Sequence, residues 1–285
     1  MQTSRALQPS PPYSLSTMGA RLVVIGGGKM GEALVSGLLT AGWAAPEEVV
    51  VTEKLAPRRD ELVRNLVARY PGLVVTDEPA PAGGAVLAVK PDDVEAACHA
   101  VAAAGISPLL SIAAGVPLAR LEQCLGEGFA VVRAMPNTPA LVGAGASAIA
   151  PGKEAGDAEL AWAEEILSAV GTVVRVPERL LDAVTGLSGS GPAYVFLVTE
   201  ALIEAGVLVG LPRPVSSQLV QQTLLGSARL MATSTEGPES LRAAVTSPGG
   251  TTAAGLRALE AGAVRHAFLE AVAAATERSK ELGQG

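Results

Sequence analysis

Aromatic residues are scarce in this chain of 285 residues, at 3% of the sequence. Cysteine and histidine are scarcer still, with two residues of each. Cys98 and Cys124 fit neither a disulfide framework nor the spacing of a zinc site. His99 and His266 are too few for a histidine-rich metal centre. We therefore expect no bound metal.

Excess positive charge and long apolar runs are also missing. Lysine and arginine number 21 against 28 acidic residues, a net charge of −7 with no basic cluster, which excludes nucleic acid as a partner. No uninterrupted apolar run reaches the roughly 18 residues of a membrane span, so we predict no membrane association. Residues 1–17 resemble neither a signal nor a transit peptide. We expect a flexible tail there and a cytoplasmic protein, with Met18 as an alternative start.

The remaining composition is that of a globular protein. Hydrophobic residues make up 49% and charged residues 17%, which excludes a disordered chain. The length allows two domains. Mean hydropathy is high, at +0.37. We interpret the excess as surface buried between the subunits of a homo-oligomer, and the alternative is an unusually apolar core.

Strand and helix patterns alternate along the N-terminal half. The predicted strands are 21–25, 49–52, 73–75, 85–89, 109–112, 130–133 and 172–176. Continuous apolar strands that alternate with helices imply a parallel sheet covered on both faces. We therefore predict an α/β fold with a Rossmann-type doubly wound sheet over residues 18–176.

A glycine fingerprint stands between the first strand and the first helix. Gly26-x-Gly28-x-x-Gly31 matches the dinucleotide-binding pattern in the position that this pattern requires. Gly26 would form the tight turn, Gly28 would admit the pyrophosphate, and Gly31 would let the helix pack near the strand. The alternative is a plain strand-to-helix turn. A phosphate-binding P-loop is excluded because Met30, not serine or threonine, follows Lys29.

The end of the second strand carries conflicting signals for the cofactor. Glu53 is an acid at the position that normally binds the adenosine ribose hydroxyls. Arg58 and Arg59 follow it, and cations there favour a ribose 2′-phosphate, although both can equally be solvated helix charges. The choice between NADH and NADPH stays open.

Further candidate residues follow later strands, where ligands bind in open α/β sheets. Lys90 ends the fourth strand and is placed beside the cofactor, unless it is an ordinary surface lysine. Residues 111–115 are small enough to admit a flat ring. Asn137 and Thr138 lie in a proline-stiffened loop and offer polar contacts at the nicotinamide end, unless that loop is purely structural.

Strand signals stop near Pro177, and residues 177–285 are predicted to form a helical substrate and dimerisation domain. The predicted helices are 178–185, 192–208, 212–233, 240–245, 250–260 and 264–282. No lysine occurs between Lys153 and Lys280. Oxidation of a hydroxyl usually needs a histidine or lysine base, whereas reduction of a C=N bond does not, because a protonated iminium is already electrophilic.

The stretch Val245-Thr-Ser-Pro-Gly-Gly-Thr-Thr252 stands at the entry of a predicted helix. Such an entry presents unpaired N–H groups and the positive end of the helix dipole. Glycines there let an anion approach the main chain. A small carboxylated substrate is the ligand that this pattern favours.

Several of these segments resemble one family. Residues 186–194, of sequence Gly-Leu-Ser-Gly-Ser-Gly-Pro-Ala-Tyr, and residues 245–252 with Leu259-Glu260 are similar to the signatures of pyrroline-5-carboxylate reductases. Residues 88–91, 113–115 and 135–139 fit the same family in order. The resemblance covers roughly residues 20–280. It implies reduction of the C=N bond of Δ1-pyrroline-5-carboxylate to L-proline by NADPH or NADH, the last step of proline biosynthesis.

The resemblance also implies a helical domain that intertwines with a second subunit, in dimers that often form decamers. By position, it assigns the substrate to Ser247, Gly249, Gly250, Thr251 and Thr252, with Thr252 as the catalytic residue. It assigns the cofactor to Ile25, Gly26, Gly27, Gly28, Lys29, Met30, Ala88, Val89, Lys90, Pro91, Ala113 and Ala114. Glu178 matches an acid that touches the cofactor in some members. Gly31, Glu53 and Asn137 complete the cofactor set from the patterns above.

Two other functions were weighed. A β-hydroxyacid dehydrogenase shares this plan but needs a catalytic lysine in the helix 193–200, which has none. A non-catalytic nucleotide-binding protein is disfavoured because the stretch 245–252 shows no sign of degradation. Turnover of NAD(P)H separates that alternative from an enzyme.

Overall fold

The computed structural model describes residues 19–283, so the predicted tail over residues 1–17 lies outside the described residues. Two compact units make up the chain, with the division between Leu181 and Asp182. The predicted functional boundary at 176/177 stays a prediction. Each unit has its own architecture.

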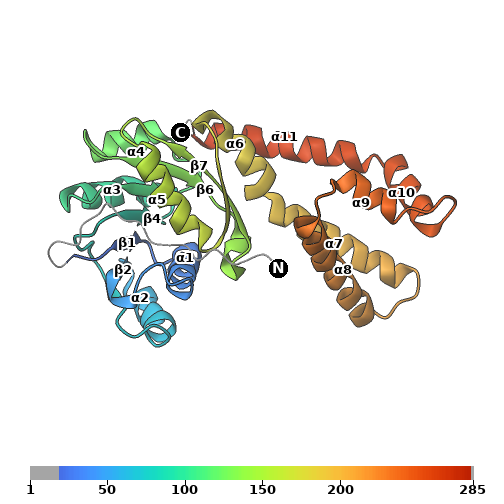
Figure 1. Cartoon of the computed structure of the whole chain (residues 1–285), viewed down its shortest axis with the longest axis horizontal. Helices are drawn as coiled ribbons and strands as arrows, with labels where there is room; N and C mark the ends of the chain where they lie inside the picture. The colour runs from blue at the N-terminus through green and yellow to red at the C-terminus, as the bar shows by residue number, and fades with distance from the viewer. Residues whose placement is uncertain (1–18, 284–285) are drawn as a thin grey trace. The chain divides into compact units, whose positions relative to one another are not determined.

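The first unit is built around one sheet with helices on both faces (Figure 1). Its strands are β1 (Leu22–Ile25), β2 (Val49–Thr52), β3 (Val74–Thr76), β4 (Ala85–Leu87), β5 (Leu109–Ser111), β6 (Val131–Met135), β7 (Gly145–Pro151) and β8 (Gly171–Arg175). Their order in the sheet is β3-β2-β1-β4-β5-β6-β7-β8. The chain runs outward in one direction from β1 and then returns to the other side of it at β4. A ligand crevice is expected at that reversal, beyond the carboxyl ends of the strands.

All neighbouring strands are parallel except β6 and β7, which are antiparallel. The sequence analysis missed β7. Its residues, Gly-Ala-Ser-Ala-Ile-Ala-Pro, include few β-branched side chains and so carry little strand propensity. Pairing with β6 on one side and β8 on the other supplies the hydrogen bonds that hold it. The predicted Rossmann-type fold class is confirmed, with β7 and β8 running opposite to the other six strands.

Helices cover the two faces of the sheet and account for its continuous apolar strands. They are α1 (Lys29–Thr40), α2 (Ala56–Leu62) with a π turn η2 (Val63–Val67), α3 (Val94–Ala103), α4 (Leu118–Leu125) and α5 (Asp157–Ser168). Short 3₁₀ segments are η1 (Pro46–Glu48), η3 (Pro91–Asp93), η4 (Thr138–Val142) and η5 (Glu178–Leu180). Along β1, Leu22 and Val24 pack in the core with α1 and α5, whereas Val23 and Ile25 pack in the core with α3 and α4. Both faces of the sheet are therefore buried at β1.

The second unit is entirely helical among its described residues. After α6 (Leu181–Val184) come a π turn η6 (Thr185–Gly189), α7 (Gly191–Leu208), α8 (Arg213–Thr233), α9 (Pro238–Ala244), α10 (Thr251–Ala261) and α11 (Val264–Gly283). Helices α7 and α8 approach closely at a small residue, since a Cβ added at Gly206 would overlap the Ser216 hydroxyl. That hydroxyl donates to the Ile203 carbonyl at 2.9 Å. The predicted helices match these within a few residues.

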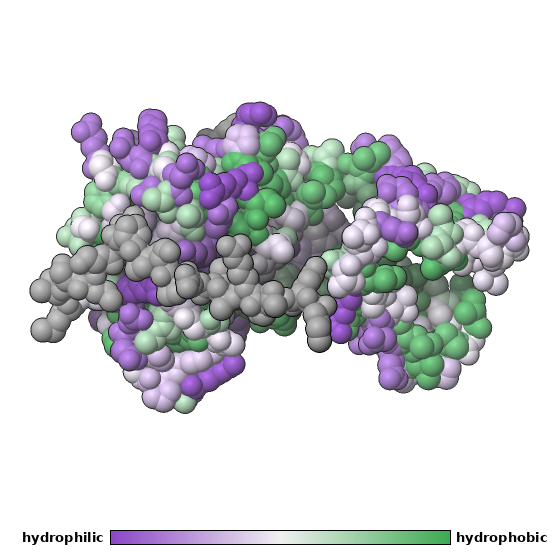
Figure 2. Space-filling model, in the orientation of Figure 1, coloured by the Kyte–Doolittle hydropathy of each residue, from purple (hydrophilic) through white to green (hydrophobic). Residues whose placement is uncertain are grey.

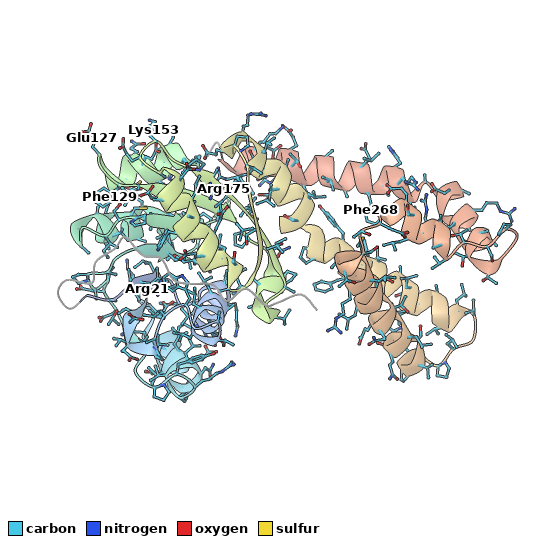
Figure 3. All side chains as sticks on the ribbon, viewed as in Figure 1. Arg21, Glu127, Phe129, Lys153, Arg175 and Phe268 are labelled. Carbon is cyan, nitrogen blue, oxygen red and sulfur yellow. The ribbon has the colours of Figure 1, made fainter. Side chains whose placement is uncertain are left out.

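Large apolar side chains lie exposed on the second unit. Figure 2 shows apolar surface over these helices, and Phe268 on α11 (Figure 3) is 43% exposed. Others are Val195, Phe196, Leu197, Leu208, Val209, Leu219 and Leu269. By length and composition, the helical stretch Glu178–Leu208 could cross a membrane, with a hydropathy of 1.4 and none of its apolar window buried. Polar residues interrupt it, which is why no continuous apolar run signals it in the sequence.

Candidate active site

The turn between β1 and α1 is shaped by its glycines. Gly26 has a φ of +103°, and a Cβ there would lie 2.6 Å from the Ala88 carbonyl oxygen. A Cβ at Gly31 would overlap the Gly26 carbonyl oxygen, and one at Gly27 would overlap the Leu62 side chain. Gly28 differs, because a Cβ there would meet no atom within 4 Å. The turn thus packs tightly inward and leaves the N-terminus of α1 open, as a pyrophosphate requires.

A cavity of about 220 Å³ lies at the carboxyl ends of four strands, β1, β4, β5 and β6. Its lining residues are Met30, Ala88, Val89, Ile112, Ala114, Met135 and Pro136. Four of them, Met30, Ala88, Val89 and Ala114, belong to the predicted cofactor set. The walls are apolar and small, which suits a flat aromatic ring. These residues fit a nicotinamide, and the cavity lies where an α/β sheet binds its ligand.

Ile112, Met135 and Pro136 were not among the predicted cofactor residues. They follow strands β5 and β6 directly, so their position at the strand ends was visible in the sequence. Their side chains carry no polar group, however, and apolar residues give no chemical signal of a site. The cavity brings their three side chains to one site, within the stretches 111–115 and 135–139 that the sequence had indicated.

The other predicted cofactor residues surround this cavity and turn. Lys29, Lys90 and Pro91 are exposed, whereas Ile25 is buried at the end of β1 and Ala113 is buried after β5. Asn137 accepts a hydrogen bond from the Ala146 backbone N–H at 2.8 Å through its side-chain oxygen. This bond fixes the loop after β6 to the start of β7.

The acid at the end of β2 is held by the main chain. The Glu53 carboxylate accepts the Gly27 N–H at 3.1 Å through one oxygen and the Leu55 N–H at 2.9 Å through the other. The structure therefore joins Glu53 to the glycine turn, 26 residues earlier in the sequence.

Arg58 and Arg59, which left the choice between NADH and NADPH open in the sequence, both bind protein groups. Arg58 donates from Nε to the Gly27 carbonyl at 2.7 Å, and its other two nitrogens lie 2.5 Å from Glu32 and 2.6 Å from Glu61. Burial alone would lower the pKa of Arg58, but the two carboxylates outweigh it and raise the pKa above its ordinary value. Arg59 donates to the backbone carbonyls of Glu53 and Lys54.

Glu178 lies at the start of η5, and its carboxylate is bound to protein groups. Its Oε1 accepts from the Arg133 guanidinium at 2.9 Å and from the Leu118 N–H at 2.7 Å. Leu118 begins α4, immediately after the loop that carries Ala113 and Ala114. The contacts place Glu178 as a support of that loop.

In the second unit, the predicted substrate residues form the turn that enters α10. Gly249 has a φ of +70°, and a Cβ at Gly250 would overlap the Ser247 hydroxyl, so both glycines are needed for the turn. Gly250 is the N-cap residue of α10, and no side chain caps this N-terminus among the described residues. The first-turn N–H groups, including those of Thr251 and Thr252, are thus available to an anion.

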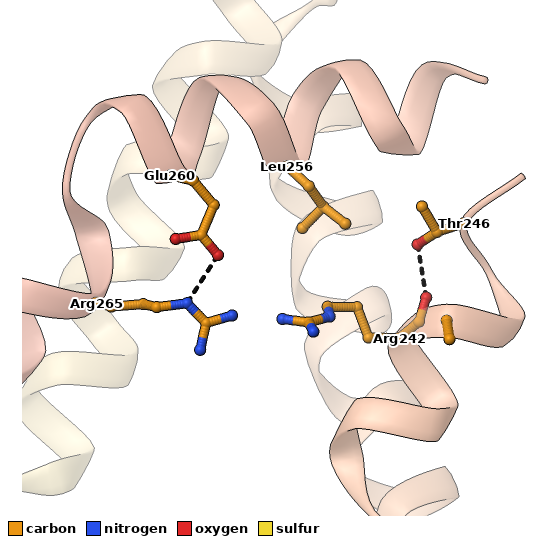
Figure 4. A pocket seen from close by; sticks show the side chains of 6 residues that line it. Arg242, Thr246, Leu256, Glu260 and Arg265 are labelled. Carbon is orange, nitrogen blue, oxygen red and sulfur yellow. Dashed lines mark hydrogen bonds and ion pairs between the residues drawn. The ribbon is translucent and has the colours of Figure 1, made fainter. Parts of the chain in front are cut away.

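A second cavity, of about 390 Å³, lies beside this turn, between α9, α10 and the start of α11 (Figure 4). It is lined by Arg242, Ala243, Thr246, Leu256, Glu260 and Arg265. Figure 4 shows the guanidinium groups of Arg242 and Arg265 pointing toward one another, with Arg265 bound to Glu260 at 2.7 Å. None of the predicted substrate residues lines it. No cluster of metal-ligating side chains occurs within residues 19–283.

Comparisons with family models match both units. Residues 21–115 match the model for NADP oxidoreductases, coenzyme F420-dependent. Residues 178–282 match the model for pyrroline-5-carboxylate reductase dimerisation.

Individual relatives agree with these models. The chain is 47% identical over 271 residues to the pyrroline-5-carboxylate reductase of a Synechocystis strain, covering 94% of this chain and all of the relative. It is 44% identical to that of Mycobacterium tuberculosis, covering 92% of this chain and 97% of the relative. The solved structure of the Coxiella burnetii reductase matches with a TM-score of 0.86 at 36% identity, covering 93% and 99% of the two chains. The Plasmodium falciparum reductase, solved with NADP bound, matches with a TM-score of 0.78 at 31% identity, covering 93% and 98%.

A glycine turn and a strand-end cavity on a Rossmann-type sheet, followed by a helical dimerisation unit, define a nicotinamide-dependent oxidoreductase. Together with the relatives, they narrow this class to one family. The chain belongs to the pyrroline-5-carboxylate reductases. The predicted family, fold class, NAD(P)H-dependent reductase activity and place in proline biosynthesis are confirmed.

Proposed function

We propose that this chain reduces Δ1-pyrroline-5-carboxylate to L-proline, with its cofactor held in the first unit and its substrate in the second. The observation that carries the proposal is the strand-end cavity beside the open turn at Gly28. The proposed cofactor residues are Ile25, Gly26, Gly27, Gly28, Lys29, Met30, Gly31, Glu53, Ala88, Val89, Lys90, Pro91, Ala113, Ala114 and Asn137. Ile112, Met135 and Pro136 join them from the cavity. Glu178 supports the loop 113–117 through Leu118 and Arg133.

The substrate carboxylate is proposed to bind the turn 247–252. Gly249 and Gly250 let the anion approach the backbone, and the Thr251 and Thr252 N–H groups donate to it at the positive end of α10. Ser247 shapes the turn. The hydroxyl of Thr252 reaches the imine nitrogen or the carboxylate and orients the ring.

NAD(P)H supplies the hydride when bound. The chain then needs to orient a protonated iminium and exclude water from it, and the amine product is basic enough to take its remaining proton from solvent. Such a reaction does not require a lysine as proton donor or acceptor. This agrees with the absence of lysine between Lys153 and Lys280. Apolar walls at Met30, Ile112 and Met135 would keep water from the reduced ring.

We also propose a homodimer in the cytoplasm, with the decamer as its higher assembly and no association with membranes. The exposed apolar side chains of α7, α8 and α11 support burial against a second copy, and the matching dimerisation model covers all three helices. The stretch Glu178–Leu208 would then contact protein instead of lipid. Light scattering after size exclusion in detergent-free buffer tests this. A requirement for detergent would overturn it.

A direct assay tests the activity. Absorbance of NADH and of NADPH is followed in parallel with pyrroline-5-carboxylate as substrate. Substrate-dependent oxidation of at least one cofactor is expected, with proline as the product. No oxidation of either cofactor would overturn the proposed function.

A further inference from the structure

We infer that this reductase selects NADH over NADPH, with Glu53 as the residue that discriminates and Arg58 as a residue that positions the glycine turn for either cofactor. This inference rests on the proposed dinucleotide site and adds a choice of cofactor to it. The sequence alone left that choice open, because acid and arginines stand together after β2. The hydrogen bonds decide it.

Glu53 is oriented before any cofactor binds. Its two oxygens each accept a backbone N–H, from Gly27 and from Leu55, at 3.1 and 2.9 Å. The carboxylate is therefore fixed at the end of β2, next to the turn that is shaped for the pyrophosphate. Each oxygen keeps a lone pair for a ribose hydroxyl, since a carboxylate oxygen can accept two hydrogen bonds. A 2′-phosphate at the same place would set about two negative charges against it.

Arg58 cannot compensate that repulsion in the observed arrangement. Its three nitrogens already contact the Gly27 carbonyl, Glu32 and Glu61, and its side chain is 16% exposed. Three of its five N–H groups are thus used, and a phosphate approaching the remaining two would lie beside the negative charges of Glu32 and Glu61. Arg58 instead stabilises the glycine turn by donating to the Gly27 carbonyl, while the Glu53 carboxylate accepts the Gly27 N–H.

Arg59 is also bonded to protein groups and is not assigned as a ligand of the 2′-phosphate. It donates to the backbone carbonyls of Glu53 and Lys54 and so stabilises the start of the loop before α2. The contacts around the turn join three carboxylates (Glu32, Glu53, Glu61) and two guanidinium groups, and the charges of Lys29 and Arg64 act on Glu61. Lys54, the residue after Glu53, is an exposed cation. A flexible, hydrated lysine offers a weaker phosphate contact than an arginine fork.

The test compares both cofactors in the full-length wild-type protein and in four variants. Binding of NADH and NADPH is titrated by nucleotide fluorescence without substrate, and kcat/KM is measured for each with pyrroline-5-carboxylate. The wild type is expected to prefer NADH at least about tenfold, which equals about 1.4 kcal/mol. Glu53→Ser is expected to reduce that preference about tenfold or more, in binding as in turnover.

Arg58→Gln is the matched control on the same turn. As a positioning residue, Arg58 is expected to affect both cofactors alike, so that the ratio of NADPH to NADH stays within about twofold. A selective loss of NADPH in this variant would show that Arg58 binds the phosphate, and would overturn the inference. Lys54→Ala is expected to leave the ratio unchanged, and a selective loss of NADPH there would overturn it too.

A combined variant tests the sequestered arginine directly. Glu53→Ser with Glu32→Gln and Glu61→Gln frees Arg58, and NADPH use is expected to rise above that of Glu53→Ser alone. If the wild type turns over but prefers NADPH, or uses both equally, the inference fails while the proposed function holds. If neither cofactor is oxidised, the proposed function itself fails.

Discussion

The Arg133 guanidinium on β6 lies 2.9 Å from the Glu178 carboxylate at the start of η5. The same carboxylate oxygen accepts the Leu118 N–H at the beginning of α4. One ion pair thus joins three segments that are far apart in the sequence, with only 10% of the Arg133 side chain exposed. The loop 113–117, which carries two proposed cofactor residues, ends at this junction.

Removing one partner of this pair is expected to be costly. Arg133→Ala leaves the Glu178 carboxylate without its cation and should lower the free energy of unfolding by about 3 kcal/mol. Urea denaturation followed by circular dichroism measures this. Arg175→Ala is the matched control, because Arg175 (Figure 3) is 42% exposed and its pairs with Glu164 and Asp157 should together contribute about 1 kcal/mol or less. Equal losses in the two variants would contradict the buried role of Arg133.

Two glycines of the β1–α1 turn should respond differently to alanine. Gly31→Ala forces a methyl group against the Gly26 carbonyl, and we expect a loss of about 1–3 kcal/mol in stability. Gly28→Ala meets open space in the protein alone, so stability should hold while NADH binding weakens about tenfold or more. Thermal unfolding and nucleotide titration of both variants measure these effects. Unchanged NADH affinity in Gly28→Ala would show that the pyrophosphate does not bind at this turn.

The hydroxyl of Thr252 is expected to contribute one hydrogen bond to the substrate. Thr252→Ala should lower kcat/KM roughly 5- to 150-fold, which corresponds to a loss of about 1–3 kcal/mol in transition-state stabilisation. Thr252→Ser keeps the hydroxyl and serves as control, with activity close to that of the wild type. Steady-state kinetics with varied pyrroline-5-carboxylate separate the two. Full activity in Thr252→Ala would exclude its proposed role.

Cys98 should be inert in the folded protein. It is fully buried on α3, and burial, with a smaller contribution from Cys124, raises the pKa of its thiol to about 12. Because the thiolate is the reactive form, Cys98 stays protonated and unreactive at mildly alkaline pH. In a Cys124→Ser variant, labelling by a disulfide reagent should be at least about 100-fold slower than in concentrated guanidinium chloride. Rapid labelling of the native variant would contradict this.

Much of the fold was predictable because its signals are local. Apolar runs such as Leu22–Ile25 and Val49–Thr52 are continuous, and both appear as strands with both faces covered. The proline and glycine positions around the second unit's helices marked their ends within a few residues. The strand β7 escaped because alanine, glycine and serine carry no strand signal, and its pairing with β6 supplies what its propensity lacks.

The candidate site was predictable in its motifs and not in its contacts. The spacing of Gly26, Gly28 and Gly31 indicated a dinucleotide turn, and the open position at Gly28 agrees with that interpretation. Ile112 lies in the stretch 111–115 that we expected to admit a flat ring, and Met135 and Pro136 lie in the stretch 135–139 that resembles the family. Their apolar side chains gave no individual signal, and the cavity is what shows that they line one site.

By itself, the sequence determined the family, the order of the elements apart from β7, and the two glycine-rich turns, since each depends on residues within about ten positions of one another. Only the tertiary structure decided what Glu53, Arg58 and Glu178 do. Each has a partner 26 to 60 residues away, and strand register and helix packing bring these together. A charged side chain carries the same signal whether it binds a ligand, a backbone N–H or another charge, so its role depends on its neighbours in space.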